Sequence, residues 1–196
     1  MTAVALVISL LGVALTLSEG RTLAAGAGGP ILDGWTLALT VLIALGLLGV
    51  AVRARSAALA VFAAVFSLVA IEENVAWHGE LGARMASRFD LSAFTRIAAA
   101  PPQAWGEFLV LTAVAAVGAA AVLAVLPGRR PRRPLAVLTM LLGLLFLFAA
   151  VADLLTAARP DLPFGWVEEL GELAVLSVAF GYVSGLVALD PAWLGR

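Results

Sequence analysis

The chain lacks lysine and cysteine altogether, and it contains a single histidine, His78. Without a lysine amine, a retinal or pyridoxal Schiff base cannot form. Without cysteine there are no disulfides, thiolate metal sites or thiol nucleophiles, although this absence says nothing about the redox compartment. One histidine also excludes zinc sites that take two or three histidines from one chain, such as the HExxH helix.

Charged residues are scarce as well. They make up 13% of the 196 residues, whereas soluble domains carry about a quarter. Apolar residues make up 63%, and the mean hydropathy is +1.07. The net charge is −1 and no long polybasic tail is present, so the composition indicates the lipid bilayer as a partner and excludes a nucleic-acid face.

Six apolar stretches bounded by charge, proline or glycine predict an all-α fold, a polytopic bundle of transmembrane helices. Because a helix needs about 20 apolar residues to cross the bilayer, the length leaves room for one integral membrane domain over residues 1–196 and little else. The first stretch has no basic n-region and no clear cleavage site, so we interpret it as an uncleaved helix. The predicted spans are 3–18, 33–52, 57–77, 104–126, 135–157 and 165–189.

Two short loops, residues 53–56 and 127–134, are strongly basic. Positive residues in short loops stay in the cytoplasm, which predicts a multi-pass protein of the cell membrane with both termini inside. Four tryptophans then fall at outer helix ends, where indole rings prefer to lie: Trp35, Trp77, Trp105 and Trp166.

The outer loop 78–103 carries a helical pattern of its own. Leu81, Met85 and Phe89 share one stripe, and Arg84 and Arg88 share another. This pattern predicts a short amphipathic helix on the outer interface. Two interpretations stay open, a lid over the acidic residues or a passive surface helix.

Two span starts resemble each other. Residues 102–107 and 163–168 both read P-x-x-W-x-E, and residues 30–35 follow more loosely. Either the chain holds three related helical hairpins or the similarity arose by chance.

Acidic residues concentrate on the predicted outer side, and only Asp190 falls inside. Asp33, Glu107, Glu168 and Glu169 open helices that begin outside, where the helix dipole favours a carboxylate, and Glu172 is a further candidate. Glu72, Glu73 and Asp153 instead lie near the ends of outward-running helices, where the dipole disfavours them. The twelve outer acids are Glu19, Asp33, Glu72, Glu73, Glu80, Asp90, Glu107, Asp153, Asp161, Glu168, Glu169 and Glu172.

A carboxylate at this depth costs up to about 2.5 to 3.5 kcal/mol unless something offsets it. Outer-loop arginines, protonation and a bound cation are the three alternatives. A metal ion is the candidate cofactor, with potential ligands Glu72, Glu73, His78, Asp153, Glu169 and Glu172. Glu169 and Glu172 share a helix face and form the expected far wall. Further pocket candidates are Asn74, Trp77, Glu80, Trp105, Glu107, Trp166 and Glu168.

Three functions are compatible with these patterns. The first is an outward-facing acidic pocket that binds a proton, metal ion or small organic cation, in a transporter or a substrate-binding membrane subunit. The second is an accessory subunit that contacts a partner or a second copy through the small residues Ser177, Gly181 and Gly185. The third is an intramembrane enzyme that uses paired carboxylates.

Overall fold

The computed structural model describes residues 30–75, 77–95, 99–125, 132–162 and 164–189, and every element in these ranges is helical. The predicted all-α fold is therefore confirmed. The predicted first span, Glu19 and Asp190 lie outside the described residues.

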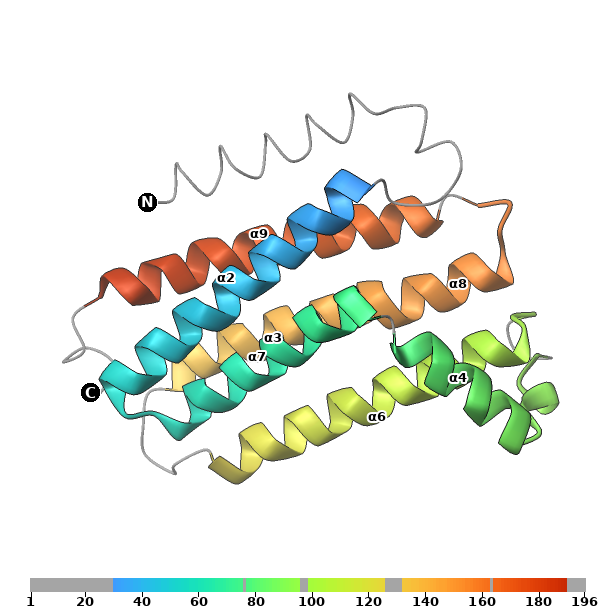
Figure 1. Ribbon diagram of the computed structural model, residues 1–196, viewed down its shortest axis with the longest axis horizontal. Helices are drawn as coiled ribbons and strands as arrows, with labels where there is room; N and C mark the ends of the chain where they lie inside the picture. The colour runs from blue at the N-terminus through green and yellow to red at the C-terminus, as the bar shows by residue number, and fades with distance from the viewer. Residues whose placement is uncertain (1–29, 76, 96–98, 126–131, 163, 190–196) are drawn as a thin grey trace.

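The long helices run back and forth along one axis (Figure 1). Helix α4 lies at one end of the bundle, which we call the α4 end. The elements in chain order are α2 (Pro30–Ala54), α3 (Ala57–Val75), α4 (Trp77–Arg88), η2 (Leu91–Ala93), α6 (Pro102–Val125), α7 (Arg132–Phe146), η3 (Leu147–Ala152), α8 (Asp153–Ala158) and α9 (Phe164–Ala188).

Four helical segments are long and apolar enough to cross a membrane: Asp33–Ala54, Pro102–Val125, Arg133–Ala158 and Phe164–Ala188. A fifth, Ala57–Glu72, qualifies together with α4, from which it is bent by 79°. Their outward faces are apolar; on α6, Val117 is 70% and Leu123 68% exposed. Such surfaces are compatible with lipid and not with water, so this is a membrane protein, and five of the six predicted spans coincide with these segments.

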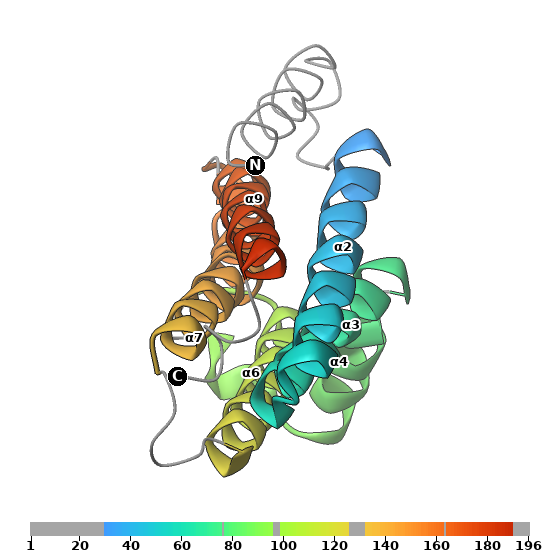
Figure 2. The ribbon, with the colours of Figure 1, turned by 90° about the vertical axis from the view of Figure 1, so that its left-hand side faces the viewer.

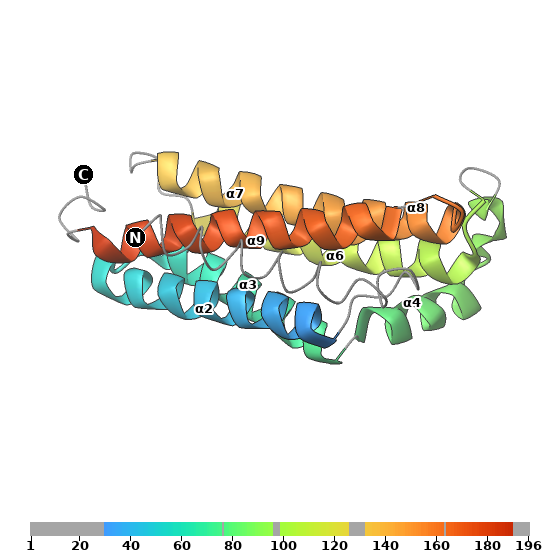
Figure 3. The ribbon, with the colours of Figure 1, turned by 90° about the horizontal axis from the view of Figure 1, so that it is seen from above.

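The core lies where α2, α3, α7 and α9 meet. Ile43, Leu47, Phe62, Leu138 and Leu176 are fully buried there. Seen end on and from above, α2 and α3 form one side of the bundle and α7 and α9 the other (Figures 2 and 3).

The predicted amphipathic helix is present as α4. The face that it turns toward the bundle is not the apolar stripe that the sequence pattern indicated. Gly82 is buried and Ala86 packs against an apolar cluster, whereas Leu81 and Phe89 are exposed. Two residues of the apolar stripe, Leu81 and Phe89, therefore point away from the bundle, as expected of a helix resting on a bilayer interface, whereas Met85 is half-buried.

The predicted span 135–157 contains a change of helix type, which the apolar pattern did not predict. Residues Leu147–Ala152 form a π-helical segment between α7 and α8. Phe148 in this segment packs so closely on α9 that a Cβ atom added at Gly171 would lie 2.2 Å from the Phe148 ring. A π turn adds a residue to the helical repeat and so changes the direction of the side chains that follow, the first of which is Asp153.

Candidate functional site

Glu72 and His78 form an ion pair at the bend between α3 and α4. Glu72 lies in the last turn of α3, and His78 is the second residue of α4. The 79° bend between the two helices brings the side chains together, so that Nδ1 of His78 contacts Oε1 of Glu72. Both are mostly withdrawn from solvent, with 18% of Glu72 and 27% of His78 exposed. Histidine, which sequence reasoning considered as a metal ligand, is here the partner of a carboxylate.

Glu107 reaches the same region through a close crossing of α4 and α6. A Cβ atom added at Gly106 would lie 2.2 Å from the carbonyl oxygen of Gly82, so the two backbones touch. Gly79 faces the Glu107 carboxylate, whose Oε1 lies 3.6 Å from the position of a Cβ there. Gln103 donates a hydrogen bond from Nε2 to this same oxygen at 3.0 Å.

Sequence reasoning did not identify these glycines. The available signal was the spacing of Gly79 and Gly82 on one helix, with Gly106 beside an acid on another. Small residues at such spacing allow two helices to approach closely.

Asp153 follows the π segment and is half-buried. It interacts electrostatically with Glu107 and with His78. Glu168 of α9 is also half-buried, and it interacts with Asp153, His78, Glu169 and Glu172. We refer to Glu72, His78, Glu107, Asp153 and Glu168 as the α4-end residues.

The interpretation of Glu107, Glu168 and Glu169 as acids at helix starts was wrong. Helices α6 and α9 begin at Pro102 and Phe164, so none of the three lies in a first turn. The dipole acts only within that turn, and it therefore does not account for these carboxylates. Asp33 does lie in the first turn of α2, as predicted, and it is exposed.

Other outer acids have local partners. Glu80 accepts a hydrogen bond from Arg84 at 2.5 Å, and both side chains are 70% exposed. Asp161 pairs with Arg159 at 3.2 Å, also on the surface. Among the described residues on this side, arginines therefore form ion pairs with two acids at the surface, Glu80 and Asp161. The partner of Glu72 is a histidine, His78.

The other candidates are Glu73, Asn74 and three tryptophans. The side chains of Glu73 and Asn74 are not described. Trp77 and Trp166 are half-buried at helix starts. Trp105 is only 9% exposed, and it packs in an apolar cluster with Leu91, Leu154 and Ala158 rather than lining a pocket.

His78 is the titratable group that joins these carboxylates. Its hydrogen bond to Glu72 raises its pKa above the ordinary value, burial opposes this, and the charges of Glu72, Glu107 and Asp153 add to the increase. Within the described part of the chain, no three histidine or acidic side chains are grouped so that they could hold a metal ion.

Comparison with protein families, curated proteins and solved structures finds no match to this chain.

Proposed function

We propose that the protein binds a cation at its α4 end, which we take as the outer side, and that this binding serves transport across the membrane. The proposal depends on the excess of negative over positive charge among the α4-end residues. Four carboxylates and one imidazole are half-buried and interact electrostatically there. Like charges close together in a partly desolvated setting are stabilised when a proton or another cation neutralises them.

The proton is the cation that the described side chains support best. His78 already shares a contact with Glu72, and the charges of Glu107 and Asp153 act on it. A proton can therefore be held by the Glu72–His78 pair and passed to a neighbouring carboxylate without a ligand shell of fixed geometry. A small organic cation is the second candidate, because it too needs negative charge without close coordination.

The location of these groups suits exchange with the outer side. Glu72 and Asp153 belong to membrane-spanning segments, whereas His78 belongs to α4, which turns away from them. An ionisable chain that extends from an interfacial helix into the membrane is typical of proton pathways in transporters. Here α4 would be the entrance, held against α6 by the contact of Gly82 with Gly106.

Thermal unfolding of the purified protein tests cation binding. We expect the wild-type protein to be stabilised by lower pH or by one cation from a panel of sodium, magnesium, zinc and tetramethylammonium. Neutralising Glu72, Glu73 and Asp153 together, as Gln, Gln and Asn, should abolish that stabilisation. The matched control, Glu80→Gln with Asp161→Asn, removes two acids of the same side that pair with arginines, and it should leave the response unchanged.

Proteoliposomes that contain a pH-sensitive dye test transport. Wild-type protein should carry protons inward when a pH gradient is imposed, and the triple variant should not. Equal stabilisation of wild-type and triple-variant protein would contradict the binding proposal. Binding without any flux would contradict only the transport step.

One observation favours the alternative of an accessory subunit. Gly185 on α9 is exposed, and a Cβ atom added there would meet nothing within 4 Å. A partner helix could therefore approach α9 at this position. Gly185→Leu should release a protein that co-purifies from native membranes if this surface is an interface, and it should change nothing if it is not.

A further inference from the structure

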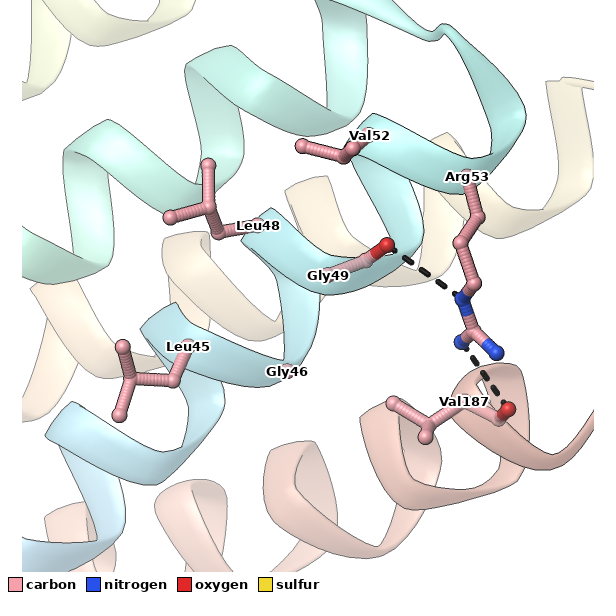
Figure 4. Close-up of a pocket in the computed structure, with 7 residues that line it drawn as sticks. All are labelled: Leu45, Gly46, Leu48, Gly49, Val52, Arg53 and Val187. Carbon is pink, nitrogen blue, oxygen red and sulfur yellow. Dashed lines mark hydrogen bonds between the residues drawn. The ribbon is translucent and has the colours of Figure 1, made fainter.

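An apolar groove lies on the surface of α2 beside the last turns of α9, at the end of the bundle opposite α4 (Figure 4). Its volume is about 540 Å³. Six of its lining residues come from α2 and one from α9: Leu45, Gly46, Leu48, Gly49, Val52, Arg53 and Val187. Leu45 and Arg53 are eight positions apart, which is about 12 Å along a helix, so the groove runs along α2 into the membrane.

Two glycines give the groove its shape. A Cβ atom at Gly46 would lie 2.7 Å from Cγ1 of Val183, so α9 touches α2 at this point. At Gly49, three residues further along, a Cβ atom would meet nothing within 4 Å. Gly49 lies on the exposed side of α2 beside Leu48 and Val52, so its missing side chain leaves a notch that is open to the lipid side.

Arg53 lies across one end of this space. Its Nε donates to the carbonyl oxygen of Gly49 at 3.4 Å, and its Nη2 donates to the carbonyl oxygen of Val187 at 3.0 Å (Figure 4). These bonds hold the guanidinium between the two helices and use two of its five N–H groups. The other N–H groups are available to an anion, and guanidinium matches the geometry of phosphate.

We propose that this groove binds an anionic phospholipid, with an acyl chain along Gly49 and the phosphate on Arg53. The lining is apolar along the membrane-spanning part and cationic at the end, which is the polarity of such a lipid.

Native mass spectrometry of the full-length protein in mild detergent tests the proposal. The probes are phosphatidylglycerol, phosphatidylcholine and diacylglycerol with identical acyl chains. We expect the wild-type protein to retain phosphatidylglycerol best and diacylglycerol least. Arg53→Gln should weaken phosphatidylglycerol binding about tenfold, because it removes a charge-assisted bond to the phosphate.

Gly49→Leu should weaken binding of the same lipid, because the new side chain occupies the groove without meeting other atoms. Two matched controls should retain wild-type binding. Gly143→Leu adds the same side chain on α7, where a Cβ atom also meets nothing within 4 Å. Arg88→Gln removes an arginine at the opposite end of the bundle, on α4.

Three results would overturn the proposal: no phosphatidylglycerol bound to wild-type protein, equal binding of all three lipids, or unchanged binding by Arg53→Gln. Cysteine crosslinking can give a fourth result that would overturn the proposal. Because the chain has no native cysteine, any disulfide must involve the introduced residues. If Gly49→Cys forms a disulfide in native membranes with cysteines placed through residues 3–18, or with a second copy, protein occupies the groove. If neither crosslink forms, the lipid assignment is supported.

Discussion

Replacing Gly106 by alanine is the sharpest test of how α4 is held against α6. The added Cβ would lie 2.2 Å from the carbonyl oxygen of Gly82 and 2.8 Å from its carbonyl carbon. Both atoms belong to the backbone, so no side chain can rotate aside. To restore ordinary van der Waals contact, α4 must retreat by about 1 Å, and the contacts that α4 makes with α6 must loosen.

The expected magnitude has two parts. Overpacking of this kind costs about 1 to 3 kcal/mol of unfolding free energy. Alanine in place of glycine inside a helix offsets about 0.5 to 1 kcal/mol of that cost. Gly118→Ala on the same helix isolates the steric part, because a Cβ there lies an ordinary 3.6 Å from Cγ2 of Val65. Gly106→Ala should therefore be less stable than Gly118→Ala by about 1 to 3 kcal/mol.

Unfolding by sodium dodecyl sulfate in mixed micelles measures this difference. Trp105 adjoins the mutated position and is nearly buried, so its fluorescence should report the loosening directly. A retreat of α4 would also separate His78 from Glu72, and Gly106→Ala should weaken the pH response of the protein as well as its stability. If Gly106→Ala is as stable as Gly118→Ala, α4 and α6 do not touch at this crossing and the reasoning is refuted.

Three further predictions concern other parts of the chain. Gly171→Ala should destabilise the protein by about 1 to 3 kcal/mol, because its Cβ would meet the ring of Phe148; Phe148→Leu in the same chain should recover part of the loss in a double-mutant cycle. The raised pKa of His78 predicts a stabilisation that is complete below the unfolded value of about 6.5 and that declines as the pH rises through the higher folded value; thermal unfolding from pH 5 to 9 should show this decline, and Glu72→Gln should flatten it. Arg55→Gly should stabilise the protein by about 1 to 2 kcal/mol in the same micelle assay, because Arg55 has a φ of 48° and only glycine adopts that region without strain; unchanged stability would show that the turn is not strained.

Much of the architecture followed from the sequence. The five predicted spans within the described residues match helices to within a few residues, because proline, glycine and charge bound each apolar run. The short helix in loop 78–103 was predicted from the stripe of Leu81, Met85 and Phe89. Leu81 and Phe89 face away from the bundle, and the packed face that contains Gly82 was missed.

The candidate site was predicted less completely. Glu72, His78 and Asp153 were named, and the structure gives them electrostatic partners. Glu107 and Glu168 were named as further pocket candidates, but their positions were attributed to helix capping, which the helix starts at Pro102 and Phe164 contradict. The metal interpretation has no support among the described side chains.

The sequence by itself determined that this is a membrane protein made of helices. Lipid offers no partner for backbone N–H and C=O groups, so apolar runs of this length satisfy them internally. Only the tertiary structure decided which faces meet. The spanning helices are apolar on all sides, so their hydrophobicity does not distinguish the inner face from the lipid face. The contact of Gly82 with Gly106, the pairing of Glu72 with His78 and the π turn before Asp153 depend on close approach and helix rotation, which leave the hydrophobic pattern unchanged.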